Sequence, residues 1–186
     1  MVNELIVNIT SALDKLEIPY MIIGGQAVLM YGEPRLTKDI DITLGISHER
    51  LADIINLSEK LSFSSLADNI ESFVNRTMVF PLEDKKSGLR VDFIFSFTEY
   101  EREAIKRAVN IMLDNSAVKF ASVEDVIIHK IFAGRPRDIE DIKGIIYKNK
   151  NFDKSYVLKW LKLFDETDNK NKLLDMFNSI LVDLEF

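Results

Sequence analysis

Apolar residues recur along the chain with two different periods. Residues 3–16 place leucine and isoleucine three or four positions apart, a spacing that predicts an amphipathic helix ending before Pro19. Residues 20–23 are apolar without interruption and predict a short buried strand. Residues 38–44 alternate strictly, with isoleucine or leucine at every second position, which predicts a half-buried strand. Helix and strand therefore alternate from the first residues of the chain.

The same two patterns continue to the end of the chain. They predict helices over residues 26–31, 47–61, 98–110 and 122–134 and from Arg137 to near Glu185, with strands over 75–83, 89–97 and 117–122. Residues 84–88 end in glycine between two strands and predict a hairpin turn. We expect a mixed α/β core over residues 1–121 and a helical C-terminal region over 122–186 that packs on it.

Composition excludes several kinds of site. The 186 residues are 47% hydrophobic and 29% charged, as in an ordinary globular protein. There is no cysteine, which excludes disulfides and a thiolate-bound zinc. The only histidines are His48 and His129, too few for a metal site made of histidines alone. Any metal must be held by oxygen, which favours magnesium, manganese or calcium.

Charge and hydropathy bear on the partners of the protein and on its location in the cell. The formal net charge of −6 argues against a protein that binds nucleic acid by charge neutralisation alone, although it leaves room for a local basic patch. The sequence has neither a signal-peptide pattern at its start nor an apolar run of 18 residues. We therefore expect a cytoplasmic protein with no membrane segment.

Aspartates interrupt two of the predicted strands. Asp39 and Asp41 lie on one face of their strand, roughly 7 Å apart, opposite a row of isoleucines. Asp92 stands in a later strand, on the face opposite a phenylalanine row. If the strands are neighbours, three carboxylates converge and need cations, such as a magnesium pair. Asp92 would then suit the roles of metal ligand and of general base for an attacking hydroxyl. The alternative is a solvated acidic face on an edge strand.

Two glycines supply the other half of such a site. Gly24 and Gly25 lie between a buried strand and a helix, where backbone N–H groups can approach phosphates closely. Arg35 lies just upstream of the aspartates and offers a cation to a triphosphate. Glycine pairs are common at strand-to-helix turns, so this signal gains its weight from the aspartates that follow it.

These residues resemble a known motif. The segment "GGQAVLMYGEPRLTKDIDI" is similar to the glycine-plus-D-x-D motif of the DNA polymerase beta-like nucleotidyltransferase superfamily, most of all to its AbiEii/AbiGii-type toxin branch. The matching positions are Gly24, Gly25, Ala27, Gly32, Arg35, Thr37, Asp39 and Asp41. The later "RVDFIF" resembles the strand that carries the third carboxylate, Asp92. The likeness implies a nucleotidyltransferase fold, a bound NTP, Mg2+ or Mn2+, and Asp39, Asp41 and Asp92 as metal ligands and catalytic residues.

The segment "HKIFAGRPRDIEDI" is similar to a downstream segment of the same branch. On that pattern Lys130 contacts nucleotide phosphate, and Arg137, Asp138 and Asp141 line the second side of the cleft. The alternatives without a functional role are a Lys130 that extends its amine to solvent and an acidic helix face exposed to water. Arg35 and Thr37, which the resemblance places near the nucleotide, have the alternative of only setting the loop conformation.

Two features depart from the family pattern. Many members have Gly-Ser, where this chain has Gly25 in place of the serine and so offers only backbone donors. The chain is also shorter than the typical toxins of the branch, which leaves less helical structure to hold an acceptor.

These observations predict a metal-dependent nucleotidyltransferase that moves a nucleoside monophosphate from an NTP to a hydroxyl. The acceptor is an RNA, a protein or a small molecule, and an antitoxin partner follows from the resemblance alone. The alternatives are an antibiotic-type adenylyltransferase and a non-catalytic nucleotide-binding module on the same fold.

Overall fold

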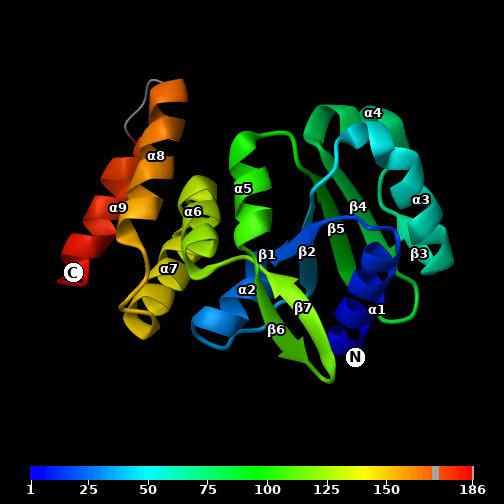
Figure 1. Ribbon diagram of the computed structural model, residues 1–186, viewed down its shortest axis with the longest axis horizontal. Coiled ribbons are helices and arrows are strands. Elements are labelled where there is room, and N and C mark those ends of the chain that lie inside the picture. The colour runs from blue at the N-terminus through cyan, green and yellow to red at the C-terminus, as the bar shows by residue number, and fades with distance from the viewer. Residues whose placement is uncertain (169–171, 186) are drawn as a thin grey trace. The chain divides into compact units, whose positions relative to one another are not determined.

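The computed structural model describes residues 1–168 and 172–185 (Figure 1). By their contacts these residues form two compact units. The first unit comprises Met1–Gln26 and Thr37–Ala121, and the second comprises Ala27–Leu36 and the chain from Ser122 onward. The predicted class, a mixed α/β protein with helices at its C-terminal end, is confirmed.

The first unit is built on one seven-stranded sheet with the order β3-β4-β5-β2-β1-β7-β6. Its strands are β1 (Tyr20–Ile23), β2 (Asp39–Leu44), β3 (Phe63–Ser65), β4 (Val79–Asp84), β5 (Arg90–Phe95), β6 (Val109–Leu113) and β7 (Ser116–Phe120). The sheet is mixed, because β2 runs parallel to β5 on one side and antiparallel to β1 on the other. Two strands far apart in sequence are thereby neighbours at the middle of the sheet.

Five α-helices begin in the first unit: α1 (Val2–Lys15), α2 (Gly24–Tyr31), α3 (Leu51–Lys60), α4 (Ile70–Thr77) and α5 (Glu99–Arg107), with a 3₁₀ turn at His48–Arg50 before α3. Of these, α2 continues into the second unit. The other helices of the second unit are α6 (Val123–Ala133), α7 (Pro136–Lys148), α8 (Lys154–Asp168) and α9 (Lys172–Asp183). Here α6 contacts α7, α8 and α9, so it is the central helix of that unit.

One face of the central strands is entirely apolar and buried. Its residues on the neighbouring strands β2 and β5 are Ile40, Ile42, Leu44, Val91, Phe93 and Phe95, each with 0% of its surface exposed. Because side chains alternate along a strand, this burial turns the intervening residues to the opposite face. Two helices that contribute to the unit's core contact strands on either side of this centre, α1 at β7 and α3 at β3.

Several local predictions are confirmed. Thr98 and Glu101 form the predicted capping box at the start of α5, and the Ser122 hydroxyl accepts a hydrogen bond from the Asp125 amide at the start of α6. The hairpin turn over residues 84–88 is present, with Gly88 at φ +68°. Short-range hydrogen bonds determine these features, which is why their sequence signals suffice.

Other predicted boundaries were wrong. Residues 75–77 belong to α4, which Asn69 caps by accepting a hydrogen bond from the Ser72 amide, and the strand starts only after Met78, whose left-handed backbone ends the helix. The helix predicted to reach residue 110 ends at Arg107, because Val109 and the residues after it pair with β7. None of the helices in the described part of the chain combines the length and the apolar composition that a membrane span needs.

Candidate active site

The register of β2 on β5 brings the predicted carboxylates together. Asp41 lies directly opposite Asp92, and Asp39 lies opposite Arg90. All four residues stand on the face of the sheet opposite the buried isoleucines and phenylalanines, since side chains alternate along both strands. Asp41 and Asp92 are half-buried and Asp39 is exposed. The first unit therefore presents an acidic row at the middle of its sheet, which we call the carboxylate face: Asp39, Asp41 and Asp92.

Arg90 supplies a cation to the carboxylate face. Its Nε donates to both oxygens of Asp92, at 2.9 and 3.1 Å. This hydrogen bond raises the pKa of the Arg90 guanidinium above its ordinary value, against a smaller lowering by burial. The negative charges of Asp39 and Asp41 raise this pKa further. Glu83 pairs with Arg90 across β4 and β5 and so lies on the same face.

Neither Arg90 nor Glu83 was assigned a role from the sequence. The signal for Arg90 was present, because a residue two positions before Asp92 on a strand shares its face. Glu83 could be placed only from the pairing of the two strands.

Gly24 closes the carboxylate face on the side of β1. Ile23, the last residue of β1, pairs with Asp41, and the next residue, Gly24, begins α2. A Cβ added at Gly24 would lie 1.9 Å from Oδ2 of Asp41. Gly24 also has a φ of +63°, a conformation that glycine adopts without strain. The glycine is therefore required both by its backbone and by the carboxylate beside it, and it places the N-terminus of α2 next to Asp41.

A second group of charges lies in the second unit. The Lys130 ammonium is 2.7 Å from Oδ1 of Asp138 and 2.8 Å from Oδ2 of Asp141. Arg35 donates from Nε and Nη2 to the two oxygens of Asp141, at 3.0 and 3.1 Å. Arg135 donates from Nε to Asp138 at 2.6 Å. The structure thus joins Arg35 to three predicted residues that lie far from it in sequence, Lys130, Asp138 and Asp141. Together with Arg135 we call these five residues the ion cluster.

Burial distinguishes the members of the ion cluster. The side chains of Lys130, Asp138 and Asp141 are 6%, 2% and 7% exposed, whereas that of Arg135 is 72% exposed. Burial alone would raise the pKa of Asp138, but the hydrogen bonds from Arg135 and Lys130 outweigh it and lower this pKa. The interior of the cluster is therefore a fixed set of paired charges.

The remaining predicted residues take separate positions. Gly25 is buried in the first turn of α2, and Thr37 is half-buried before β2. Arg137 is exposed in the first turn of α7, one residue before Asp138.

The donor types on the carboxylate face fit a divalent oxygen-binding cation. Asp41 and Asp92 are in register, and the missing side chain at Gly24 lets the Asp41 carboxylate lie against the start of α2. As the side chains stand, the described residues contain no group of three acidic, histidine or cysteine side chains placed to hold a metal ion. The guanidinium of Arg90 lies against Asp92 instead.

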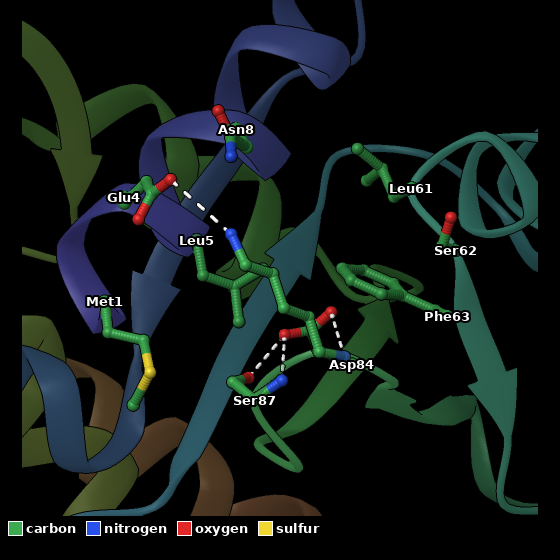
Figure 2. Close-up of a pocket in the computed structure, with 10 residues that line it drawn as sticks. Met1, Glu4, Leu5, Asn8, Leu61, Ser62, Phe63, Asp84 and Ser87 are labelled. Carbon is green, nitrogen blue, oxygen red and sulfur yellow. Dashed lines mark hydrogen bonds and ion pairs between the residues drawn. The ribbon is translucent and has the colours of Figure 1, made fainter.

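A cavity elsewhere in the first unit has a different character (Figure 2). It measures about 270 Å³ and lies between α1 and the start of β3, beside the turn after β4. The Asp84 carboxylate at its edge accepts hydrogen bonds from the Ser87 amide and hydroxyl and from the Lys86 amide. These bonds lower the pKa of Asp84 against the opposing effect of burial. Its polar groups therefore hold the hairpin turn, and none of the carboxylate-face residues lines it.

Nearly the whole sequence matches a family of proteins. The family model covers residues 1–178 and is described as a nucleotidyltransferase of unknown function, DUF6036. The chain belongs to this family. Among curated proteins, none matches the sequence.

Solved structures share the fold of this DUF6036 nucleotidyltransferase. The antibiotic-resistance factor ANT(2'')-Ia is 20% identical with a TM-score of 0.60, over 98% of this chain and 94% of that one. The lincosamide antibiotic adenylyltransferase LnuA is 14% identical with a TM-score of 0.55, over 76% and 94%. An antigenic nucleotidyltransferase-like protein from Paracoccidioides brasiliensis is 20% identical with a TM-score of 0.54, over 77% and 75%. At these identities the likeness is one of fold.

Gly24→Ala should destabilise the DUF6036 protein more than Gly88→Ala. Both glycines have similar positive φ values, +63° and +68°, so each substitution costs about 1–2 kcal/mol in backbone strain. An added Cβ at Gly88 would meet no atom of the described residues within 4 Å, whereas at Gly24 it would collide with Asp41. Urea unfolding of the two variants measures the difference. Equal losses would show that Asp41 does not occupy the space beside Gly24.

Asp138→Asn should lower the free energy of unfolding at pH 7 by about 3 kcal/mol. The substitution removes one of the two carboxylate partners of the buried Lys130, which is left with Asp141 alone as its charged partner in the cluster. The pKa of Asp138 is lowered in the folded state, so its contribution is present above about pH 4 and is lost as the pH falls through the lower folded value. The gap between wild type and variant should therefore close in acid.

Asp183→Asn is the matched control. Asp183 lies 2.7 Å from the Lys143 ammonium, the same distance as in the Lys130–Asp138 pair, but the two side chains are 54% and 38% exposed. Its loss should stay within about 1 kcal/mol. Thermal or urea unfolding between pH 3 and 7 tests both variants, and a pH-independent loss at Asp138 would contradict the assignment.

Proposed function

We propose that this nucleotidyltransferase is metal-dependent and transfers a nucleoside monophosphate from an NTP to a hydroxyl. The observation that carries the proposal is the pairing of Asp41 with Asp92 beside the N-terminus of α2, where Gly24 has no side chain to displace the Asp41 carboxylate. Carboxylates in register supply oxygen ligands, and a helix N-terminus favours phosphate. The three proposed catalytic residues and metal ligands are Asp39, Asp41 and Asp92.

The reaction forms one bond and breaks one. The acceptor hydroxyl oxygen attacks the α-phosphorus, the bond from that phosphorus to the oxygen bridging to the β-phosphorus breaks, and pyrophosphate leaves. Asp92 accepts the hydroxyl proton as general base. Bound Mg2+ or Mn2+ would neutralise charge on the phosphate oxygens and favour the deprotonated acceptor. Backbone N–H groups at Gly24 and Gly25 would donate to the phosphates.

The ion cluster supports a further part of the proposal, that its residues take part in binding nucleotide phosphate. Three cations, Lys130, Arg35 and Arg135, face two anions, Asp138 and Asp141, so the cluster carries one excess positive charge (3 − 2 = 1). Because Lys130 is buried and paired with two carboxylates, the excess positive charge is shared by the whole cluster and is not located on Lys130. We propose that Arg35, Thr37, Lys130 and Arg137 contribute to nucleotide binding and that Asp138 and Asp141 hold the cations in place.

The acceptor is proposed as an RNA, a protein or a small molecule. The likeness of the glycine and D-x-D motif to AbiEii/AbiGii-type toxins supports a toxin with an antitoxin partner. The likeness of fold to ANT(2'')-Ia, over 94% of that chain, supports an antibiotic-type adenylyltransferase as the second candidate. A single screen separates the two: incubation with each α-labelled NTP and Mg2+, offering cell lysate in one arm and aminoglycosides or lincosamides in the other.

The metal requirement is tested without any acceptor. Mg2+ or Mn2+ together with an NTP should raise the melting temperature by more than the sum of the two separate effects, because each completes the binding site of the other. Additive shifts would contradict a shared metal–nucleotide site.

A further inference from the structure

We infer that Arg90 is a built-in counter-cation that competes with the divalent metal for Asp92, so that metal loading requires its guanidinium to leave. The inference rests on the metal site of the proposed function. It adds a residue that sets how tightly the site holds metal when no nucleotide is bound.

The geometry places the guanidinium where the metal charge is needed. Arg90 precedes Asp92 by two positions on β5, and its Nε donates to both carboxylate oxygens at 2.9 and 3.1 Å. Asp39 lies opposite Arg90 and Asp41 opposite Asp92 in the same parallel register. The Arg90 guanidinium thus stands beside three carboxylates and offsets part of their mutual repulsion.

Exposure shows which partner is free to move. The Arg90 side chain is 50% exposed, whereas that of Asp92 is 15% exposed. The guanidinium can therefore turn toward solvent while the carboxylate stays in place on its strand. The Lys130–Asp138 pair is the contrast, because both of its side chains are less than 10% exposed and neither has solvent to turn toward.

The two cations oppose each other at the same carboxylate. A guanidinium hydrogen-bonded to both oxygens of Asp92 takes up part of their lone-pair capacity, and its charge repels a dication at short range. An NTP changes this balance, because its phosphates bring negative charge that can take the released guanidinium as a partner. Metal should therefore bind weakly to the nucleotide-free protein and more tightly with the NTP.

The test is Mn2+ binding to the nucleotide-free protein, followed by electron paramagnetic resonance of free Mn2+. Arg90→Gln should bind Mn2+ about tenfold more tightly than wild type, as expected for removal of a competing charge-assisted hydrogen bond. Adding Asp92→Asn to Arg90→Gln should abolish the gain. Unchanged or weaker Mn2+ binding in Arg90→Gln would overturn the inference.

Arg50→Gln is the matched control. Arg50 also donates from Nε to an aspartate, Asp53 at 2.8 Å, and its side chain is 46% exposed, close to the 50% of Arg90. The Arg50→Gln variant loses the same charge from the first unit, but the partner of Arg50, Asp53, lies outside the carboxylate face. The Mn2+ affinity of this variant should therefore equal that of wild type. An equal gain in both variants would reduce the effect to net charge and overturn the role of Arg90.

Two further measurements cover the case in which Arg90→Gln unfolds and separate this inference from the proposed function. If Arg90→Gln unfolds, Arg90→Lys keeps a charge without the planar donor pair and should show a smaller gain in Mn2+ affinity; no gain overturns the inference. Metal-dependent transfer by wild type with unchanged Mn2+ binding in the variants would remove the inference and leave the proposed function standing. An absence of Mn2+ binding in every protein, with and without NTP, would overturn both.

Discussion

Asp92→Asn is expected to lower the rate of nucleotidyl transfer at least about a hundredfold, since general-base catalysis is commonly worth that much. NTP affinity should change by no more than about tenfold, a cost of roughly 1.4 kcal/mol. The two effects separate because Asp39 and Asp41 together can still hold one metal with its nucleotide. The acceptor hydroxyl, in contrast, loses the group proposed to take its proton. Single-turnover kinetics with a labelled NTP measures the rate, and equilibrium dialysis measures the affinity.

Asp53→Asn is the control for that experiment, because Asp53 is an aspartate bonded to an exposed arginine outside the carboxylate face. Its rate should match wild type. A transfer rate that is unchanged in Asp92→Asn would remove the proposed mechanism. A loss of NTP binding as large as the loss of rate would assign Asp92 to nucleotide binding alone.

Asp41→Asn is expected to abolish the stabilisation that metal and NTP produce together, while leaving the metal-free fold as stable as wild type or more so. Asparagine has the shape of aspartate and fits in the same place beside Gly24, which has no Cβ to collide with it. Removing one negative charge also relieves repulsion within the carboxylate face. Thermal unfolding with and without Mg2+ and NTP tests both parts. A variant that unfolds without metal would show that Asp41 is structural.

The carboxylate face was predictable in part. Alternation along residues 38–44 and 89–97 placed Asp39 with Asp41, and Asp92 opposite a phenylalanine row, because a strand has a period of two. The parallel pairing of β2 with β5 could not be predicted, since it joins strands separated by two helices and two other strands. The direct opposition of Asp41 and Asp92 comes from that pairing, whereas Glu83 is placed by the pairing of β4 with β5.

The ion cluster shows the same limit. The resemblance implied that Lys130 contacts nucleotide phosphate and that Asp138 and Asp141 line the second side of the cleft. Their mutual pairing depends on the packing of α6 against α7, which brings Lys130 within reach of both aspartates. Arg35, from before β2, completes the set. No local pattern encodes these contacts, whereas the capping box at Thr98 is encoded within four residues.

The hairpin of β6 and β7 carried a signal that was not used. Leu113 pairs with Ser116, so Asp114 and Asn115 form a two-residue turn, with Asp114 at φ +52°. Aspartate and asparagine between two apolar runs favour such a turn. Extending the predicted helix to residue 110 overlooked it.

The most direct test of metal-dependent nucleotidyl transfer follows both ends of the nucleotide. Wild type is incubated with Mg2+, the acceptor fraction found in the screen, and an NTP labelled at either the α- or the γ-phosphate. The α-label should enter the acceptor and the γ-label should leave as pyrophosphate, in equal amounts, and both should disappear with a chelator or in Asp41→Asn. Transfer of the γ-label to the acceptor, or α-label transfer that persists in Asp41→Asn, would contradict the account.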